Sequence, residues 1–410
     1  MKILILTQYF YPETGAPQNR LFSLASNLKK YTQDIEVLTA MPNYPKMEIF
    51  KGYKGKWYCK EEMENITIHR APIYVSKSKK IFSRLLNYFS FVFSSLWIGL
   101  RKVKSTDVII CESPPLFLGI SAYILSRVKG AKLVFNVSDL WPESAEKLDL
   151  ISNKTALKLT YGLEKWLYKV SHLVTGQTQG IVKNINARFP EMDAYWFRNG
   201  IDLNQFNTDA KRDIFSEKYS LTENDFVLLY AGILGYAQGL EIIIHAADNL
   251  KRKPTIKFVI IGDGPEHGKL VKLQQDLKLT NVIFTGNIDR KEIPSAIASS
   301  SAYIVPLKKS DLFLGAIPSK LFEPLIMKVP IILGVDGEAR ELFINQGNAG
   351  LYYEPENCEE LIKCINDLYD NNELRQRLGS NGHNYVKQKF DRDEISKEFW
   401  DILNKRLTQQ

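Results

Sequence analysis

The sequence lacks several features that mark particular classes of protein. Its four cysteines form no CxxC pair, so neither a zinc site nor a disulfide framework is indicated, and a reducing cytoplasm fits. None of the five histidines has a partner at metal-ligand spacing. Zinc fingers, arginine-rich arms, repeats and low-complexity segments are also missing, which argues against a nucleic-acid partner. We therefore expect no bound metal, no cofactor and no nucleic acid.

No apolar run is long enough to span a bilayer, which takes about 20 residues. The opening MKILILTQYFYPETG has a short apolar run without a signal-type cleavage site, and it predicts a first buried strand. The most apolar stretch, residues 81–100, has only 16 residues between Arg84 and Arg101. We expect a cytoplasmic protein without a transmembrane helix.

Positive charge is concentrated in the first half of the chain. Residues 1–198 hold 28 Lys/Arg and 16 Asp/Glu, whereas residues 199–410 hold 26 and 30. The segment 46–104 alone holds 13 basic and four acidic residues. An anionic partner is therefore expected for the N-terminal half, and a membrane surface suits it better than nucleic acid.

Residues 81–100 carry apolar side chains at helical spacing between two basic runs. One interpretation is a helix resting on an anionic membrane, with its lysines toward the headgroups. The other is a buried core helix with solvated ends. On the first interpretation, the candidate membrane or acceptor contacts are Lys79, Lys80, Arg84, Trp97 and Arg101.

Short apolar runs alternate with longer amphipathic stretches along the whole chain. The runs are rich in Val and Ile and nearly continuous, as is typical of strands buried on both faces. Strand–helix alternation predicts parallel, doubly wound α/β sheets. The polar run 208–225 precedes a new strand and places a domain boundary near 198–210. The predicted strands are 2–7, 35–40, 107–112, 132–137, 172–177, 226–232, 256–264, 302–307 and 330–334.

Four glycine-containing loops follow predicted strands, where ligands collect in open α/β sheets. Glycine lets the backbone approach a phosphate, and a following helix N-terminus favours its charge. Gly15 lies in the first loop, and Gly235 and Gln238 lie in the second, 231–241. The third is 261–266 and the fourth is 314–332.

The fourth loop carries the most specific pattern, PSKLFE. Pro318 suits a helix start, Ser319 offers a hydrogen bond and Lys320 a compact positive charge. Glu323 follows one turn later and can accept both hydroxyls of a ribose. The alternative is a solvated lysine followed by a capping glutamate.

Other polar residues follow strands in the first half. Asp139 follows a buried strand, so it either faces a reacting sugar or caps the helix begun by WPES. Glu13 and Glu112 lie in further loops as candidate acceptor contacts. Arg20, in the same motif as Glu13, is either a further candidate or an ordinary helix-surface residue. The DRDE at 391–394 is better explained by helix capping than by metal binding.

The sequence resembles the family 4 retaining glycosyltransferases of the GT-B fold. The resemblance rests on YFYPETGAPQNR, VSDLWPESA, RNGID, IGDGPE and PSKLFEPLIMKVPII, in this order along essentially the whole chain. The branch that it most resembles builds bacterial O-antigen and capsule repeats and includes N-acetyl-fucosaminyl transferase-like proteins.

The resemblance implies two Rossmann-like, doubly wound domains that face each other across a cleft. Residues 1–198 would bind the acceptor, with a C-terminal helix in 391–410 packed back on this domain, and 199–390 would bind the nucleotide sugar. It also implies transfer with retention from a nucleoside-diphosphate sugar, UDP-linked in our prediction, to a lipid-linked acceptor in surface polysaccharide assembly. The enzyme would be a hexosyl- or N-acetylhexosaminyl-type transferase, peripheral at the inner face of the cell membrane.

Two departures from the family pattern bear on the site. Gly315 stands where the family has a glutamate directed at the donor sugar, and the loop ILGYAQGLE lacks the family's Arg and Lys. Lys320 is then the leading diphosphate cation and, with Asp139, a candidate catalytic residue. Backbone amides at Gly15 and Gly235 would assist. The missing carboxylate is compatible with an acetamido-deoxy sugar. A sugar-nucleotide epimerase of the same fold and a non-catalytic sugar-nucleotide-binding scaffold remain alternatives.

Overall fold

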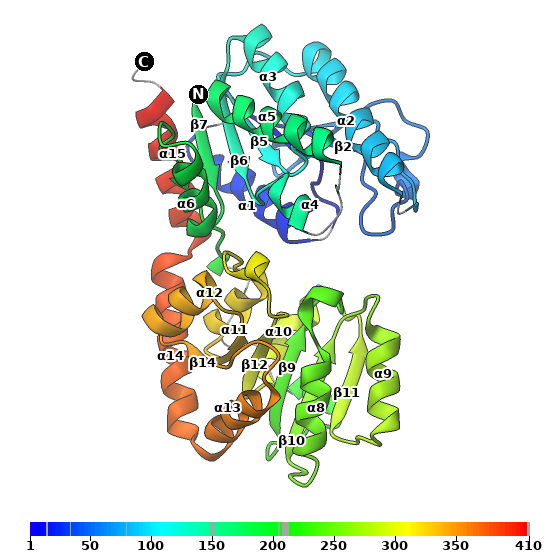
Figure 1. The fold of residues 1–410 in the computed structure, drawn as a ribbon, viewed down its shortest axis with the longest axis vertical. Helices are drawn as coiled ribbons and strands as arrows, with labels where there is room; N and C mark the ends of the chain where they lie inside the picture. Colours follow the sequence, from blue (N-terminus) through cyan, green and yellow to red (C-terminus); the bar gives the residue numbers. More distant parts are fainter. Residues whose placement is uncertain are drawn as a thin grey trace. The chain divides into compact units, whose positions relative to one another are not determined.

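The computed structural model describes residues 1–13, 15–32, 34–78, 80–147, 151, 153–203, 206 and 213–407 (Figure 1). The chain divides into two compact units, which are described one at a time. The N-terminal unit comprises Met1–Asn199 with Arg392–Gln410, and the C-terminal unit comprises Gly200–Asp391. The division from the sequence had its boundaries at 198/199 and 390/391.

The N-terminal unit is built on an eight-stranded sheet in the order β3-β4-β2-β1-β5-β6-β7-β8. All neighbouring strands are parallel except β3 and β4, which form an antiparallel hairpin. In chain order the strands are β1 (Ile3–Leu6), β2 (Ile35–Ala40), β3 (Cys59–Met63), β4 (Ile66–Ala71), β5 (Val108–Ser113), β6 (Lys132–Val137), β7 (Leu173–Gly176) and β8 (Tyr195–Trp196).

Both faces of this sheet are buried, because successive side chains of a strand point to opposite faces. Leu4 and Leu6 of β1 belong to one apolar cluster, and Ile3 and Ile5 belong to another. Helices cover the two faces. They are α1 (Ala16–Leu28), α2 (Ile81–Lys102), α3 (Leu118–Lys129), α4 (Glu143–Lys147), α5 (Lys154–Val170), α6 (Gln179–Arg188) and α15 (Arg392–Leu407).

The last helix, α15, belongs to the N-terminal unit although it follows the C-terminal unit in the chain (red in Figure 1). Its Phe399 ring stacks on Phe197, with the ring centroids 4.1 Å apart. Trp400 stacks on Tyr31, just after α1. Lys30 Nζ lies 2.7 Å from Asp393 Oδ2 at the exposed end of this interface. The helix thus completes the apolar cluster on the α1 face of the sheet.

The C-terminal unit has a six-stranded, fully parallel sheet in the order β11-β10-β9-β12-β13-β14. Its strands are β9 (Phe226–Ala231), β10 (Ile256–Ile261), β11 (Val282–Gly286), β12 (Ala302–Pro306), β13 (Ile331–Gly334) and β14 (Gly350–Tyr352). Its helices are α7 (Asp213–Lys218), α8 (Glu241–Asn249), α9 (His267–Asp276), α10 (Ile293–Ala298), α11 (Phe322–Ile326), α12 (Glu338–Arg340), α13 (Cys358–Asp370) and α14 (Asn372–Lys389).

The predicted α/β class with two Rossmann-like, doubly wound domains is confirmed. Each of the nine apolar runs proposed as strands contains a strand, and those at 35–40 and 132–137 match residue for residue. The sequence did not predict β3, β4, β8, β11 or β14, which lie toward the edges of the two sheets. Edge strands bury less surface, so their apolar pattern is weaker.

Helix α14 packs closely against the α11 region at two glycines, and at one of them a side chain would meet backbone. A Cβ built on Gly379 would lie 2.0 Å from the carbonyl oxygen of Lys328. One built on Gly382 would lie 2.6 Å from Leu325 Cδ2. A backbone oxygen cannot move aside as a side chain can, so Gly379 fixes how near the two segments approach.

We predict that Gly379→Ala destabilises the C-terminal unit by about 1–3 kcal/mol, as expected of overpacking. The control is Gly268→Ala in α9, where a Cβ would meet nothing within 4 Å; it should be neutral or stabilising by up to about 1 kcal/mol. Urea unfolding followed by far-UV circular dichroism reports both units. Tryptophan fluorescence reports the N-terminal unit alone, because it holds all six tryptophans: Trp57, Trp97, Trp141, Trp166, Trp196 and Trp400.

The circular dichroism midpoint of Gly379→Ala should therefore fall while the fluorescence midpoint stays in place. Equal circular dichroism curves for Gly379→Ala and Gly268→Ala would contradict the steric role of Gly379.

Candidate functional site

Each sheet has one topological switch point, where the chain stops adding strands on one side of a strand and continues on its other side. Ligands of open α/β sheets bind beside the carboxyl ends of the strands at this point. In the N-terminal unit the chain moves outward from β1 to β2, then returns to β5 on the other side of β1. In the C-terminal unit it moves from β9 to β10 and β11, then returns to β12. The loops that follow β1, β5, β9 and β12 are therefore the candidate site loops.

In the C-terminal unit, Lys320 extends to the end of β9. Its Nζ donates to Gln238 Oε1 at 2.7 Å and to Tyr230 Oη at 2.9 Å. Tyr230 in turn donates to the carbonyl oxygen of Ile233 at 2.7 Å. These partners occupy two of the three N–H donors of the ammonium group. Both are neutral, so they orient Lys320 without cancelling its charge.

Two glycine loops make room for this lysine. Gly232 has a φ of +151°, and a Cβ on it would lie 3.0 Å from Lys320 Nζ. Gly262, after β10, has a φ of +130°, and its Cβ would lie 1.9 Å from the carbonyl oxygen of Gly232. Only glycine fits at 262, because the clash is with backbone and the conformation disfavours other residues. The expected glycine loops thus pack on each other.

Burial lowers the pKa of Lys320 to about 7, because the loss of water around the ammonium disfavours its charged form. A lysine with this pKa is partly unprotonated at neutral pH, and it takes up a proton readily when an anion binds beside it. An anionic ligand would restore the lost solvation of the charge and raise this pKa. The site therefore has the properties of a cation that becomes fully charged on binding an anion.

Gly235 directly precedes the 3₁₀ turn Tyr236–Gln238 in the loop after β9, and Gln238 ends it. The loop after β12 secures this turn, because the N–H of Lys308 donates to the carbonyl oxygen of Ala237 at 2.9 Å. The structure thus brings Lys320 and Gln238 into contact and puts Gly235 at the start of the turn that carries Gln238. Tyr230 was missed, although a tyrosine at the end of an apolar strand was a usable signal.

The expectation of a regular helix start at Pro318 is only partly correct. Ser319–Leu321 form a 3₁₀ turn, and the α-helix proper, α11, has five residues from Phe322. Pro324 supplies no N–H within it. One short turn carries little macrodipole, so any anion held here depends on Lys320 more than on the helix end.

Glu323 and Ser319 lie differently in this turn. Ser319 is exposed at its start, whereas Glu323 is half-buried in the first turn of α11. Burial and then the nearby Glu323 carboxylate raise the pKa of Tyr303, on the neighbouring strand β12. Tyr303 Oη also donates to the carbonyl oxygen of Ala231 at 2.9 Å. Glu323 therefore lies on the same side of the sheet end as the Lys320 group.

The N-terminal unit holds a second polar cluster, at the ends of β5 and β6. Glu112 is buried and accepts from Arg20 Nη2, from Ser138 Oγ and from Asn136 Nδ2, the last at 2.6 Å. Asn136 Oδ1 accepts from Thr175 Oγ1 at 2.6 Å. Glu112 is thus engaged by a buried ion pair and two further donors.

The interpretation of Arg20 as a helix-surface residue was wrong. Its side chain is buried, and Nη2 also lies 2.8 Å from Ser138 Oγ. Burying a guanidinium requires a carboxylate partner, and Glu112 provides it. Asn136 and Thr175, inside otherwise apolar strands, were the sequence signal for this network.

Gly15 and Glu13 lie in the loop after β1. Gly15 directly precedes α1 and has an extended backbone. Glu13 is buried, and its Oε1 accepts from the backbone N–H groups of Asn43 and Tyr44 at 2.7 and 2.9 Å. Burial raises the pKa of Glu13, although these hydrogen bonds oppose the shift. Glu13 thus holds the loop after β2 against the loop after β1.

Asp139 follows β6 and lies before α4. Its Oδ1 accepts a hydrogen bond of 2.6 Å from the hydroxyl of Ser144. Desolvation raises the pKa of this carboxyl while the hydrogen bond from Ser144 opposes the shift. The residue as a whole remains exposed. The contact with Ser144 ties Asp139 to the first turn of α4, and both of its sequence-based interpretations remain compatible with this position.

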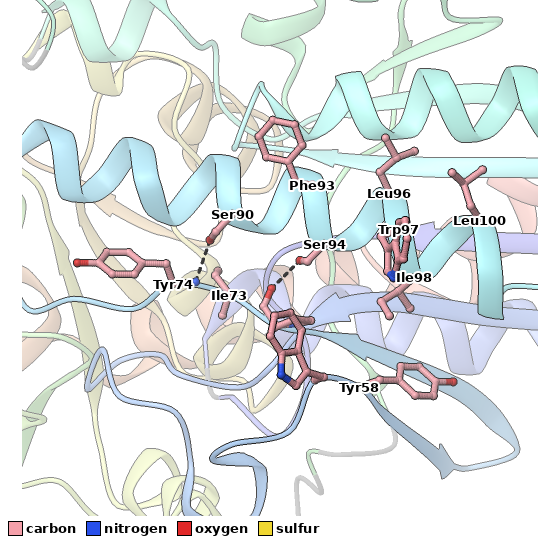
Figure 2. A pocket seen from close by; sticks show the side chains of 12 residues that line it. Tyr58, Ile73, Tyr74, Ser90, Phe93, Ser94, Leu96, Trp97, Ile98 and Leu100 are labelled. Carbon is pink, nitrogen blue, oxygen red and sulfur yellow. Dashed lines mark hydrogen bonds between the residues drawn. The ribbon is translucent and has the colours of Figure 1, made fainter.

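Helix α2 has one side in the core, as the core-helix interpretation of residues 81–100 expects, while the membrane interpretation stays a prediction. One side, including Phe91, Val92 and Ile98, is buried. The other keeps apolar side chains exposed, with Phe93 at 69% and Trp97 at 56% (Figure 2). Among the described residues, no helix is long and apolar enough to cross a membrane.

The basic residues expected at this helix lie around its two ends. Lys80 immediately precedes α2 and is exposed, as is Arg84 in its first turn. Arg101 lies in the last turn, with its guanidinium carbon 3.5 Å from the centroid of the Trp97 ring. Lys79 lies outside the described residues.

The described residues contain no group of three or more His, Cys, Asp or Glu side chains that could hold a metal ion. In the DRDE run, Asp393 pairs with Lys30. His69 hydrogen-bonds Tyr58 and Glu36, and His172 accepts from the N–H of Leu133. These side chains have structural partners.

Comparison with known proteins adds to this geometry. Residues 211–385 match the family model described as "Glycosyl transferases group 1". The chain is 27% identical over 409 residues to a protein of Escherichia coli (strain K12) named "Putative colanic acid biosynthesis glycosyl transferase WcaI". That alignment covers 97% of this chain and 98% of the relative.

Two solved structures share the fold over nearly the whole chain. The sucrose-phosphate synthase of Thermosynechococcus elongatus superposes with a TM-score of 0.77 at 14% identity, covering 100% of both chains. Anabaena Alr3699/HepE, in complex with UDP and glucose, gives 0.73 at 18% identity, covering 98% of this chain and 99% of its own. The chain thus has the two Rossmann-like domains of the GT-B fold, and its residues 211–385 are similar to the group 1 glycosyltransferases.

Proposed function

We propose that the chain transfers a sugar from a nucleoside-diphosphate donor, UDP-linked, to a lipid-linked acceptor in the assembly of a surface polysaccharide. The single observation that carries the proposal is the ammonium of Lys320, oriented by Tyr230 and Gln238 at the end of β9. The UDP and glucose in the Anabaena structure support the donor class, and the name of the Escherichia coli relative supports the pathway class.

The donor site in this proposal is built from the C-terminal unit. Lys320 neutralises the diphosphate, with Ser319 and the amide of Gly235 as further hydrogen-bond donors. Glu323 accepts from the ribose hydroxyls. Gly315 leaves room for an acetamido-deoxy sugar where the family 4 pattern has a carboxylate.

The proposed reaction proceeds with retention and without a metal. The acceptor oxygen bonds to the anomeric carbon as the bond from that carbon to the diphosphate breaks. The acceptor proton passes to the leaving phosphate. Negative charge grows on that phosphate in the transition state, so an oriented cation is the largest catalytic contribution. Asp139 would face the transferring sugar or the acceptor hydroxyl, and Glu112 would shape the acceptor side through its network with Arg20.

A transfer assay tests the function as a whole. The purified chain should release UDP from one member of a panel of UDP-, GDP-, TDP- and ADP-sugars when extracted lipid-linked saccharides are supplied, and product should form in excess EDTA. The anomeric configuration of the product, read by NMR, should match that of the donor. A strict need for Mn²⁺ or Mg²⁺ would contradict the metal-free mechanism.

A sugar-nucleotide-binding scaffold is the second candidate, favoured by Gly315 and by the absence of a cation from residues 232–239. Such a protein would bind a donor in the same panel, detected by thermal shift, and neither transfer nor hydrolyse it.

We predict that the affinity for UDP depends on the protonation of Lys320. Its pKa of about 7 in the free protein means that the ammonium form prevails below pH 7 and the neutral amine above it. From pH 7.5 to 9 the UDP phosphates stay ionised, so binding must add a proton to Lys320. Affinity should fall by up to about tenfold per pH unit in titration calorimetry.

Two substitutions separate this effect from others. Lys320→Arg keeps its charge throughout, so its affinity should vary little over the same range. Lys320→Ala should lose about 1.5–3 kcal/mol of UDP binding at pH 7. A wild-type profile as flat as that of Lys320→Arg would remove Lys320 from the diphosphate site.

We also predict electrostatic attachment to anionic membranes through the ends of α2. Replacing Lys80, Arg101, Lys102 and Lys104 with Gln should reduce co-sedimentation with phosphatidylglycerol vesicles, and salt should weaken the wild-type interaction because the Debye length at physiological salt is about 8 Å. The matched control removes four exposed lysines of α5, at positions 154, 158, 165 and 169.

Equal sedimentation of the α2 and α5 variants would show that net charge alone, and no particular surface, governs the interaction. Equal sedimentation with neutral and anionic vesicles would remove the electrostatic account of attachment.

A further inference from the structure

An open apolar groove of about 1000 Å³ runs along α2 in the N-terminal unit (Figure 2). Its other wall comes from the start of the β3 hairpin and from the segment that follows β4. The volume is at the upper end of the range of about 300–1000 Å³ found for small-molecule pockets. The lining residues are Trp57, Tyr58, Pro72, Ile73, Tyr74, Ser90, Phe93, Ser94, Leu96, Trp97, Ile98 and Leu100.

Large apolar side chains remain exposed on both walls of the groove. Trp57 is 84% exposed on one wall, and Phe93 is 69% exposed on the other. Phe82 and Leu86, nearer the start of α2, extend the exposed stripe along the same helix. A contiguous apolar surface of this kind marks a binding site.

The hydroxyl groups of Ser90, Ser94 and Tyr58 in the walls already have hydrogen-bond partners. Ser94 Oγ donates to the carbonyl oxygen of Pro72 at 2.5 Å. Ser90 Oγ donates to the carbonyl oxygen of Asn87 and accepts from the N–H of Tyr74, both at 2.8 Å. Tyr58 Oη lies 2.8 Å from His69 Nδ1. A protein interface carries about one hydrogen bond per 100–200 Å², so these walls suit a hydrocarbon better than a protein surface.

Two cations border the aromatic rings of the groove. The Arg101 guanidinium carbon lies 3.5 Å from the Trp97 ring centroid, and Lys102 Nζ lies 5.5 Å from that of Tyr58. Neither forms an ion pair with any residue that the structure describes, whereas Lys77 pairs with Glu48. The groove thus combines an apolar channel with uncompensated positive charge at one end, which complements an anionic headgroup on a hydrocarbon chain.

We propose that this groove binds a single long hydrocarbon chain that carries a phosphate, with the chain along α2 and the phosphate near Arg101 and Lys102. The ligand class is a polyprenyl-type or acyl phosphate. The inference rests on the proposed function in one respect: the lipid is then the carrier of the acceptor. Attachment to the bilayer surface and recognition of one lipid chain are separate events in this arrangement.

Farnesyl monophosphate, below its aggregation concentration and without vesicles, is the probe. Titration calorimetry should show saturable binding to the full chain, and tryptophan fluorescence should change because Trp57 and Trp97 line the groove. The double variant Phe93→Gln/Trp97→Gln should weaken binding by about tenfold or more, since it removes the exposed apolar wall. Both side chains are mostly exposed, so the fold should tolerate the change.

Two further variants define the mode of binding. Arg101→Gln/Lys102→Gln should weaken binding of farnesyl phosphate and leave binding of farnesol nearly unchanged. Leu159→Gln, which alters a 69% exposed apolar residue on α5, is the matched control and should bind like wild type.

Several outcomes would overturn the proposal. Absence of farnesyl phosphate binding by the wild type together with binding of anionic vesicles would mean that the groove rests on a bilayer as a surface. Dimerisation that the groove variants abolish would mean that a second copy covers it. Equal affinities of Phe93→Gln/Trp97→Gln and Leu159→Gln for farnesyl phosphate would also exclude the groove as the binding site. UDP binding by the same samples tests the donor site separately, so failure of one site is distinguishable from failure of the other.

Discussion

Both faces of the strands are buried, so side chains can contact a ligand only at the strand ends. This constraint determines where the polar clusters of both units lie. In both units most strand side chains pack in the apolar clusters beside the sheet. Polar function is therefore concentrated at the ends of the strands and in the loops that follow them. Lys320, Gln238 and Tyr230 meet at the end of β9, while Arg20, Glu112 and Asn136 meet at the ends of β5 and β6.

The two clusters differ in the partners of their basic residue. The partners of Lys320 in its cluster are neutral, whereas Arg20 forms an ion pair with a buried carboxylate. A partly desolvated cation with neutral partners is suited to bind an anion, and a cation in an ion pair is suited to hold neighbouring loops in place.

The apolar groove on α2 shares no residue with either polar cluster and presents a different kind of surface. The helix is amphipathic in an unusual sense, because its inner side packs in the core while its outer side presents aromatic residues between basic ends. Sequence periodicity alone could not separate a membrane helix from a core helix, since both sides are apolar. The structure shows one side of this helix buried in the core and apolar side chains exposed on the other, and contact of the exposed side with a membrane stays a prediction.

The central strands and the glycine loops could be predicted from the sequence because continuous apolar runs and glycine spacing are local signals. Lys320 could be singled out for the same reason, since PSKLFE is a contiguous pattern. The partners of Lys320 could not, because Tyr230 and Gln238 lie 90 and 82 positions away in the chain. Arg20 was misjudged on the same ground: its partner Glu112 is distant in sequence. The β3–β4 hairpin was missed because its first strand, CKEEM, is polar, although Glu64 and Asn65 at the turn, both with positive φ, are typical of a tight hairpin.

The position of α15 has a consequence for biosynthesis. Ile201 and Asp391 form a bridge, with the N–H of Ile201 donating to the carbonyl oxygen of Phe390 at 2.8 Å, so the chain enters and leaves the C-terminal unit at neighbouring points. The C-terminal unit is thus an insertion within the N-terminal one. On the ribosome, the second unit emerges complete while the first still lacks the helix that covers Phe197 and the α1 face of its sheet. The N-terminal unit is translated first but completed last, when α15 is added. Until then it exposes the apolar face that α15 covers, and exposed apolar surface of this kind is what chaperones bind.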